Sequence, residues 1–411
     1  MRPRETTHLY QTAARGWLTA AGAALLLPED VRVGIWLPLH LAMAGAVSIA
    51  IGGAMQNFAA TLTTTPQPRT VVVWTQFGLA NAGALLVAVG RSAGPPWVVA
   101  VGGLAFVGAI GVLAWIVGTA WRRSLQRRHL VPLAMYGFAI ACALIGATFG
   151  WLLGSGLVSG EAYPGLRRAH AVLNVLGWAS STIVGTLVTL LPTVLRVRMP
   201  AWHAGPTVAL FGAGVALLAT GLSVGLGLVA SLGAVSLAAS AAGLLYMAGR
   251  VLGTPRRWPV PVAACHLVAA LAWFVFGVGA LTTTVTRGEF DRFREPFLVV
   301  FVGGWVLQTL LGAWSYLLPM ARPAHPDVRR RFLAATELGG RLQVLLLNAG
   351  LVLVAARAAG WIGDGGPPWG PASRSARPRW RSRRPGRSRS SPVGRRSKVV
   401  PAGCGAADVA G

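Results

Sequence analysis

The chain has 411 residues, of which 54% are hydrophobic and only 12% are charged, and its mean hydropathy is +0.59. A soluble domain is about one-quarter charged, so this composition excludes an ordinary globular protein and predicts an integral membrane protein whose partner is the lipid bilayer. The formal net charge of +26 is carried almost entirely by arginine. Because the arginines form short clusters between long apolar runs, they are typical of loops between spans, and we expect no nucleic-acid partner.

A membrane-crossing helix needs about 20 apolar residues. On this basis we predict an all-α fold, a polytopic transmembrane helix bundle in residues 1–362, whose first span is an uncleaved N-terminal helix. Eleven spans are expected, at residues 13–28, 33–62, 70–90, 96–121, 130–153, 169–195, 206–225, 227–247, 260–284, 297–320 and 333–357. The seventh and eighth spans are separated only by Gly225-Leu226-Gly227, so their division is inferred from length.

The distribution of charge predicts the orientation of the bundle. If the N-terminus is cytoplasmic, the inner segments carry most of the arginines, including those at 122–123, 127–128 and 329–331, and the outer loops carry most of the acidic residues. This asymmetry follows the positive-inside rule. We therefore expect a multi-pass protein of the plasma membrane with a cytoplasmic N-terminus.

Residues 363–411 form a basic tail rich in Pro, Arg and Ser, with no hydrophobic periodicity. Such a segment cannot bury a core. Three interpretations stay open: a disordered tail, an arm that binds RNA or lipid, or a stretch read out of frame from GC-rich DNA. In the last case the chain is truncated or frameshifted, and the bundle would have a twelfth span that is missing here.

Two sixteen-residue stretches share a frame: GWASSTIVGTLVTLLP, which starts at Gly177, and GWVLQTLLGAWSYLLP, which starts at Gly304. Each contains a second glycine eight residues after the first, Gly185 and Gly312, on roughly the same helix face. Small residues on a membrane helix allow a neighbouring helix to approach closely. The repetition therefore reflects either shared packing needs alone or two equivalent helices of a pseudo-symmetric bundle, with a site between them.

Three histidines lie within the predicted spans: His40, His170 and His266. An ionisable side chain inside a membrane is a functional candidate, although a neutral imidazole can also simply bond to a neighbouring helix. His40 and His170 each begin an outward-to-inward span, so both lie on the outer side, and imidazole is a common ligand of haem iron and copper. Asn174 follows His170 by one turn, where it can orient the imidazole or bond across to another helix. His266 lies on the inner side, and its role stays open.

The sequences HLAMAGAVSIAIGGAMQNF, RRAHAVLNVLGW and GGWVLQTLLGAWSYLLP lie in the second, sixth and tenth spans. Together they resemble the haem–copper oxidase subunit I superfamily, and more closely its divergent NnrS-like and uncharacterised actinobacterial members. The resemblance implies a twelve-span plan, a haem-ligating role for His40 and a copper-ligating role for His170. It also implies histidines in the seventh and tenth spans, but the seventh has none and the tenth shows Phe297 and Gln308 instead. An oxygen-reducing binuclear centre cannot be assembled from this set.

We therefore expect haem b or copper to be bound near the outer face by His40 and His170, with Asn174 in support. The expected role is metal handling, electron transfer or resistance to nitric oxide stress. Two alternatives stay open, namely a transporter whose histidines line the substrate path and a structural membrane subunit without a site. The sequence contains no Walker A loop, HExxH motif or nucleophile elbow. It therefore predicts no catalytic residue, and it leaves enzymatic activity and oligomeric state undetermined.

Overall fold

The computed structural model describes residues 3–124, 129–255, 259–321 and 325–362. Within these residues every regular element is a helix, and ten helical segments are long and apolar enough to cross a membrane. This bears out the prediction of an all-α, multi-span membrane protein. The predicted tail, residues 363–411, lies outside the described residues.

Six of the ten spans are single helices, and the others are composite. The single helices are α5 (Thr70–Ala93), α6 (Pro96–Arg123), α7 (Leu130–Gly154), α10 (Ala204–Val224), α11 (Gly227–Leu252) and α12 (Val262–Thr286). The division between the seventh and eighth predicted spans lies where expected, because Gly225 ends α10 with a φ of +76°, a conformation that favours glycine.

The predicted first span, residues 13–28, is not among the ten. In its place α1 (Pro3–Ala24) begins ten residues earlier and includes the charged residues Arg4, Glu5 and Arg15, which make it more polar than the spans. The leucines that extended the predicted span lie in the turn before Pro28, after the helix has ended. Tyr10 is fully buried in α1, and its hydroxyl lies 3.1 Å from the Val73 carbonyl of α5. One face of α1, which carries both polar and apolar side chains, therefore packs against the bundle.

The last predicted span, residues 333–357, crosses a break in the helix. The structure has α15 (Pro326–Glu337) and α16 (Gly340–Ala358), joined at Gly339, whose φ of +69° favours glycine. Within α16 only Gly340 and Val344 are buried, and its leucines are largely exposed. In a membrane protein such a face is suited to contact with lipid.

Three composite spans each contain a π-helical segment, in which the turn is wider than in an α-helix. Here and below the spans keep the numbers of the eleven predicted from the sequence. The second span consists of α3 (Trp36–His40), η1 (Leu41–Val47) and α4 (Ser48–Thr63). The sixth consists of α8 (Ala162–Val172), η2 (Leu173–Ser180) and α9 (Ser181–Leu195), and the tenth of η3 (Phe290–Phe293), α13 (Arg294–Phe297), η4 (Leu298–Leu307) and α14 (Gln308–Ala321). The Gly-Trp pair that opens each repeated stretch lies in η2 or η4, so the repeated sequence corresponds to a repeated local structure.

The spaced glycines of the two repeated stretches bring the sixth and tenth spans close to a neighbour, as their spacing predicted. A Cβ on Gly177 would lie 2.5 Å from the Cβ of Cys142 in α7, and one on Gly185 would lie 2.9 Å from the Cβ of Met135 in the same helix. In the tenth span, Gly304 and Gly312 approach α12 in the same way. Each repeated stretch therefore carries a small-residue face that contacts one antiparallel helix.

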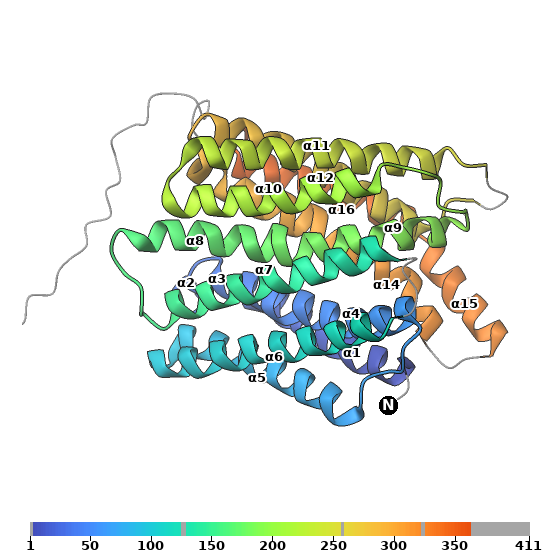
Figure 1. Ribbon diagram of the computed structural model, residues 1–411, viewed down its shortest axis with the longest axis horizontal. Helices are drawn as coiled ribbons and strands as arrows, with labels where there is room; N and C mark the ends of the chain where they lie inside the picture. Colours follow the sequence, from blue (N-terminus) through green and yellow to red (C-terminus); the bar gives the residue numbers. More distant parts are fainter. Residues whose placement is uncertain (1–2, 125–128, 256–258, 322–324, 363–411) are drawn as a thin grey trace, which may run out of the picture. The chain divides into compact units, whose positions relative to one another are not determined.

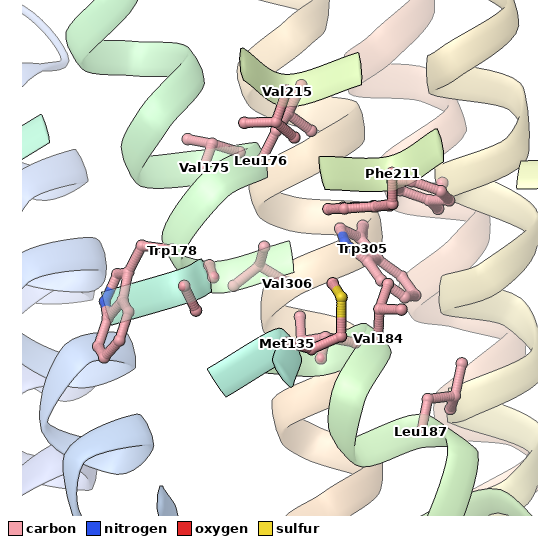
Figure 2. Packing of buried hydrophobic residues seen from close by; sticks show 14 of the residues in the cluster. Met135, Val175, Leu176, Trp178, Val184, Leu187, Phe211, Val215, Trp305 and Val306 are labelled. Carbon is pink, nitrogen blue, oxygen red and sulfur yellow. The ribbon is translucent and has the colours of Figure 1, made fainter. Parts of the chain in front are cut away.

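The sixth span lies between two helical hairpins. Figure 1 shows the hairpin of α5 and α6 on one side of it and the hairpin of α10 and α11 on the other, with α7 next to α8. Figure 2 shows part of the buried core, where Trp305 from η4 lies among apolar side chains of neighbouring helices. Both Trp305 and Phe211 are fully buried there. The spans that carry His40 and His170 both contribute residues to this core, among them Ile51 and Leu176.

Candidate functional site

His40 is the last residue of α3 and directly precedes η1. Its Nδ1 lies 2.8 Å from the backbone carbonyl of Trp36, and the Trp36 indole stacks on the imidazole with the ring centroids 4.0 Å apart. A carbonyl oxygen can only accept a hydrogen bond, so Nδ1 carries the proton and donates it. The lone pair is consequently on Nε2, which is the arrangement found in metal-ligating histidines.

His170 lies in α8, shortly before η2, and its ring lies against α7. Its Nδ1 donates to the backbone carbonyl of Gly146 at 2.8 Å, so its lone pair is also on Nε2. A Cβ on Gly150 would lie 2.5 Å from the Cε1 of His170, so the close fit of this ring depends on a glycine at that position. The imidazole is thus oriented by the backbone of a neighbouring span.

Asn174 contacts His170 as its spacing predicted. Its Nδ2 donates to the His170 backbone carbonyl at 2.7 Å and lies 3.2 Å from the His170 Nδ1. Because that Nδ1 already donates its proton to Gly146, it cannot also accept one from Asn174, so Asn174 bonds to the His170 backbone carbonyl, lies beside the ring and does not choose the tautomer.

The structure brings the imidazoles of His40 and His170 together from two separate spans. Their ring centroids are 6.3 Å apart and their planes differ by only 9°. Both residues are half-buried. A metal–nitrogen bond of about 2 Å on each side, plus roughly 1 Å from each nitrogen to its ring centre, separates two ring centres by about 6 Å. A metal ion held between the two rings also requires both Nε2 atoms to point along the line that joins the ring centres, and the observed separation meets the distance part of this requirement.

The donor set of this pair is small. Within the described part of the chain, no group of three or more His, Cys, Asp and Glu side chains could hold a metal ion together. His266 belongs to a different part of the bundle, since its Cβ packs against Gly312 of α14. Of these four residue types, the described part of the chain thus places two imidazoles together, and a cofactor such as haem could supply the remaining ligands.

A hydrogen bond that no sequence pattern indicates ties the two histidine-bearing spans together. The Trp178 indole donates to the Ser48 hydroxyl at 3.0 Å, and both residues are buried. Ser48 follows His40 by the same number of residues as Trp178 follows His170. The bond therefore joins the two spans at equal spacing along the chain from their histidines, and it aligns the spans along their axes. Figure 2 shows Trp178 directed away from the Trp305 cluster, toward the N-terminal helices.

A second bond of the same kind joins the tenth span to the sixth. The Trp305 indole donates to the Ser180 hydroxyl at 2.9 Å, and that hydroxyl donates to the Val175 carbonyl at 2.8 Å. The Ser48 hydroxyl likewise donates to a carbonyl five residues earlier, that of Met43. Ser180 is the last residue of η2 and Ser48 directly follows η1, so each serine acceptor lies at the end of a π-helical segment, and the tryptophans of the repeated stretches provide the donors. The repeat was recognisable in the sequence, but the serine partners were not.

Replacing Trp178 with Phe tests this alignment. The variant keeps an aromatic ring and loses the N–H donor, so the buried Ser48 hydroxyl loses a partner and unfolding should become easier by about 1 kcal/mol. Thermal unfolding in lipid nanodiscs would measure the loss. Trp115, whose side chain is largely exposed on α6, provides the control, because Trp115→Phe removes no buried hydrogen bond. Equal stability of the two variants would show that the Trp178–Ser48 bond does not hold the spans.

An ion pair at the same end of the bundle connects the sixth and tenth spans. Arg168 donates to Asp291 through Nε at 3.0 Å and through a terminal nitrogen at 2.5 Å, which makes the pair bidentate. Bidentate geometry adds directional preference to the electrostatic attraction. Since Arg168 lies two residues before His170 in α8, the pair also restrains the part of the helix next to this histidine.

Comparison with known proteins does not extend this description to a family. No protein-family model matches the chain, and a search of curated proteins found no match either. What the apolar helices and their packing establish is that the chain is an integral, multi-pass helical membrane protein.

Proposed function

We propose that the protein binds haem b or copper between His40 and His170, near one face of a membrane that we take to be the plasma membrane. The observation that carries the proposal is the pairing of two parallel imidazoles from different spans, with centroids 6.3 Å apart and each Nδ1 bonded to a backbone carbonyl. Both rings therefore present the nitrogen that a metal requires. Asn174 lies beside the His170 ring and donates to the His170 backbone carbonyl.

The donor set favours haem over a lone copper ion. Haem iron already has four ligands from the macrocycle and needs only axial ligands from the protein, which two imidazoles supply. A copper ion bound by the same pair would need at least one more ligand in most of its geometries. When bound, a haem would supply one-electron or nitric oxide chemistry at this face.

Arg32, eight residues before His40 in the chain, is a candidate partner for a haem carboxylate. It lies on α2 (Glu29–Arg32), the short helix that precedes α3, and its buried Nε has no hydrogen-bond partner among the described residues. One of its terminal nitrogens donates to the Gly34 carbonyl at 2.6 Å. A guanidinium with a free donor is suited to a carboxylate, and haem carries two carboxylates.

The resemblance to the haem–copper oxidase subunit I superfamily is part of the same proposal. It is supported by the adjacency of the second, sixth and tenth spans through the Trp178–Ser48 and Trp305–Ser180 bonds. The chain would then be a divergent, NnrS-like relative without the oxygen-reducing centre, because the tenth span carries Phe297 and Gln308 where that centre needs histidine. Its role would be metal handling, electron transfer or resistance to nitric oxide stress.

An optical spectrum and metal analysis of the purified protein test the proposal. We expect a Soret band, or copper at one ion per chain, that is lost in both His40→Ala and His170→Ala. His203, which lies outside the spans, provides the control, and His203→Ala should leave the signal unchanged. Folded protein that takes up neither haem nor copper would overturn the proposal. Transport of a solute that both histidine substitutions abolish would then favour a transporter.

A further inference from the structure

Four buried polar atoms where α12 meets α14 have no hydrogen-bond partner among the described residues. They are Nδ1 of His266, Nε2 and Oε1 of Gln308, and Oγ1 of Thr309. The exposed fractions of these residues are 1%, 0% and 7%. None of them belongs to the pair of His40 and His170.

The packing of the two helices places these groups near one another. A Cβ on Gly312 would lie 3.0 Å from the Cβ of His266, so this histidine packs against α14 at that glycine. Gln308 and Thr309 precede Gly312 by four and three residues, which puts them on the adjoining part of the same helix face. One turn before Gln308, Gly304 of η4 meets Trp273 of α12. Gln308 therefore lies between two close contacts of the span formed by η4 and α14 with α12.

Among the residues that the structure describes, none bonds to these four atoms. Between His266 and Trp273, the residues of α12 near the contact include Ala269 and Ala270, whose methyl groups cannot form hydrogen bonds. Hydroxyls elsewhere in the bundle bond to the carbonyl four residues earlier, as Thr182 does at 2.8 Å and Thr282 does at 2.8 Å. Thr309 makes no such bond, and its hydroxyl is left for another partner.

Leaving such groups unpaired would be costly. Each buried donor or acceptor without a partner costs about 1–3 kcal/mol, and lipid supplies no hydrogen bonds. The unpaired set is neutral and includes both donors and acceptors: an amide, an imidazole and a hydroxyl. A bare cation would require acceptors only and an anion would require donors only. Water matches a mixed set, and a buried water typically makes about three such bonds.

We propose that His266, Gln308 and Thr309 bind ordered water and form a hydrated site between α12 and α14. The site lies toward the end of the bundle that carries α15, because His266 is in the first turns of α12 and the Glu337 carboxylate accepts the Val262 N–H there at 3.1 Å. Trp305 precedes Gln308 by three residues and does not belong to the site. The indole N–H of Trp305 can only donate, and it is already bonded to Ser180.

Magnetic resonance on protein with ¹⁵N-labelled histidine in lipid nanodiscs provides the decisive test. We expect magnetisation transfer from water to the His266 ring, with the signal assigned through its disappearance in His266→Gln. The transfer should fall several-fold in Gln308→Met, which removes the amide at similar volume, and should persist in the control Leu310→Met on the same helix. Absence of transfer in the wild-type protein, or full transfer in Gln308→Met, would overturn the proposal.

The stability of the same variants gives an independent readout. If the Gln308 amide bonds to water, Gln308→Met breaks that network and lowers the melting temperature relative to Leu310→Met. If the amide is dry, removal of an unpaired buried group raises the melting temperature, and this result would also overturn the proposal. Neither measurement involves His40 or His170, so the outcome does not depend on haem or copper binding.

Discussion

Replacing Gly233 with Ala should destabilise the bundle by about 3 kcal/mol, at the upper end of the range for overpacking. A Cβ at this position of α11 would overlap with the backbone nitrogen of Leu218 and lie 2.8 Å from the carbonyl oxygen of Gly214, both in α10. Backbone atoms cannot rotate away as a side chain can. The two helices must therefore separate, and the contacts along their whole interface weaken.

The same helix supplies a matched control for this prediction. Gly249 also lies within α11, but an added Cβ there would meet nothing within 4 Å. Gly249→Ala should leave stability unchanged or raise it by up to about 1 kcal/mol, because alanine favours the helix more than glycine does. Denaturant unfolding of both variants in mixed micelles would compare them. Equal stabilities would mean that α10 and α11 are not packed backbone to backbone.

Replacing Gly150 with Ala should reduce metal or haem binding about 10–100-fold, the usual effect of disturbing the groups that orient a ligating histidine. The new methyl group would lie 2.5 Å from Cε1 and 2.9 Å from Nδ1 of His170. The ring would have to leave this position, and with it the Gly146 carbonyl that determines its tautomer. The variant keeps both imidazoles, so it tests their geometry separately from their chemistry.

Titration of the apoprotein with haem, followed at the Soret band, or with copper would measure this effect. The control is Gly137→Ala on the same helix, where an added Cβ would meet nothing within 4 Å. A normal melting temperature in Gly150→Ala would establish that lost binding reflects the displaced ring. If Gly150→Ala binds as tightly as the wild-type protein, His170 does not act as a ligand from the position that the structure shows.

The position of the two histidines at the candidate site could be predicted from the sequence, but most of their partners could not. Depth along two spans of the same direction predicted that His40 and His170 share one level of the membrane, and the structure brings their rings to 6.3 Å. The spacing to Asn174 also predicted a local contact, because residues four apart on a helix are neighbours. The Gly146 carbonyl and the Trp178–Ser48 bond come from segments far apart in the chain, so no local pattern indicated them.

The sequence alone determined that this protein is a helical membrane protein, because a run of apolar residues long enough to cross lipid must satisfy its own backbone hydrogen bonds within a helix. It also determined the close-packing faces at Gly177 and Gly304, because glycine spacing is a property of one helix. Only the tertiary structure decided that α1, which is not among the ten apolar spans, packs against the bundle. It also decided which backbone carbonyls accept hydrogen bonds from the imidazoles. Those outcomes depend on contacts between spans, and their partners are selected by packing in three dimensions rather than by the composition of any one segment.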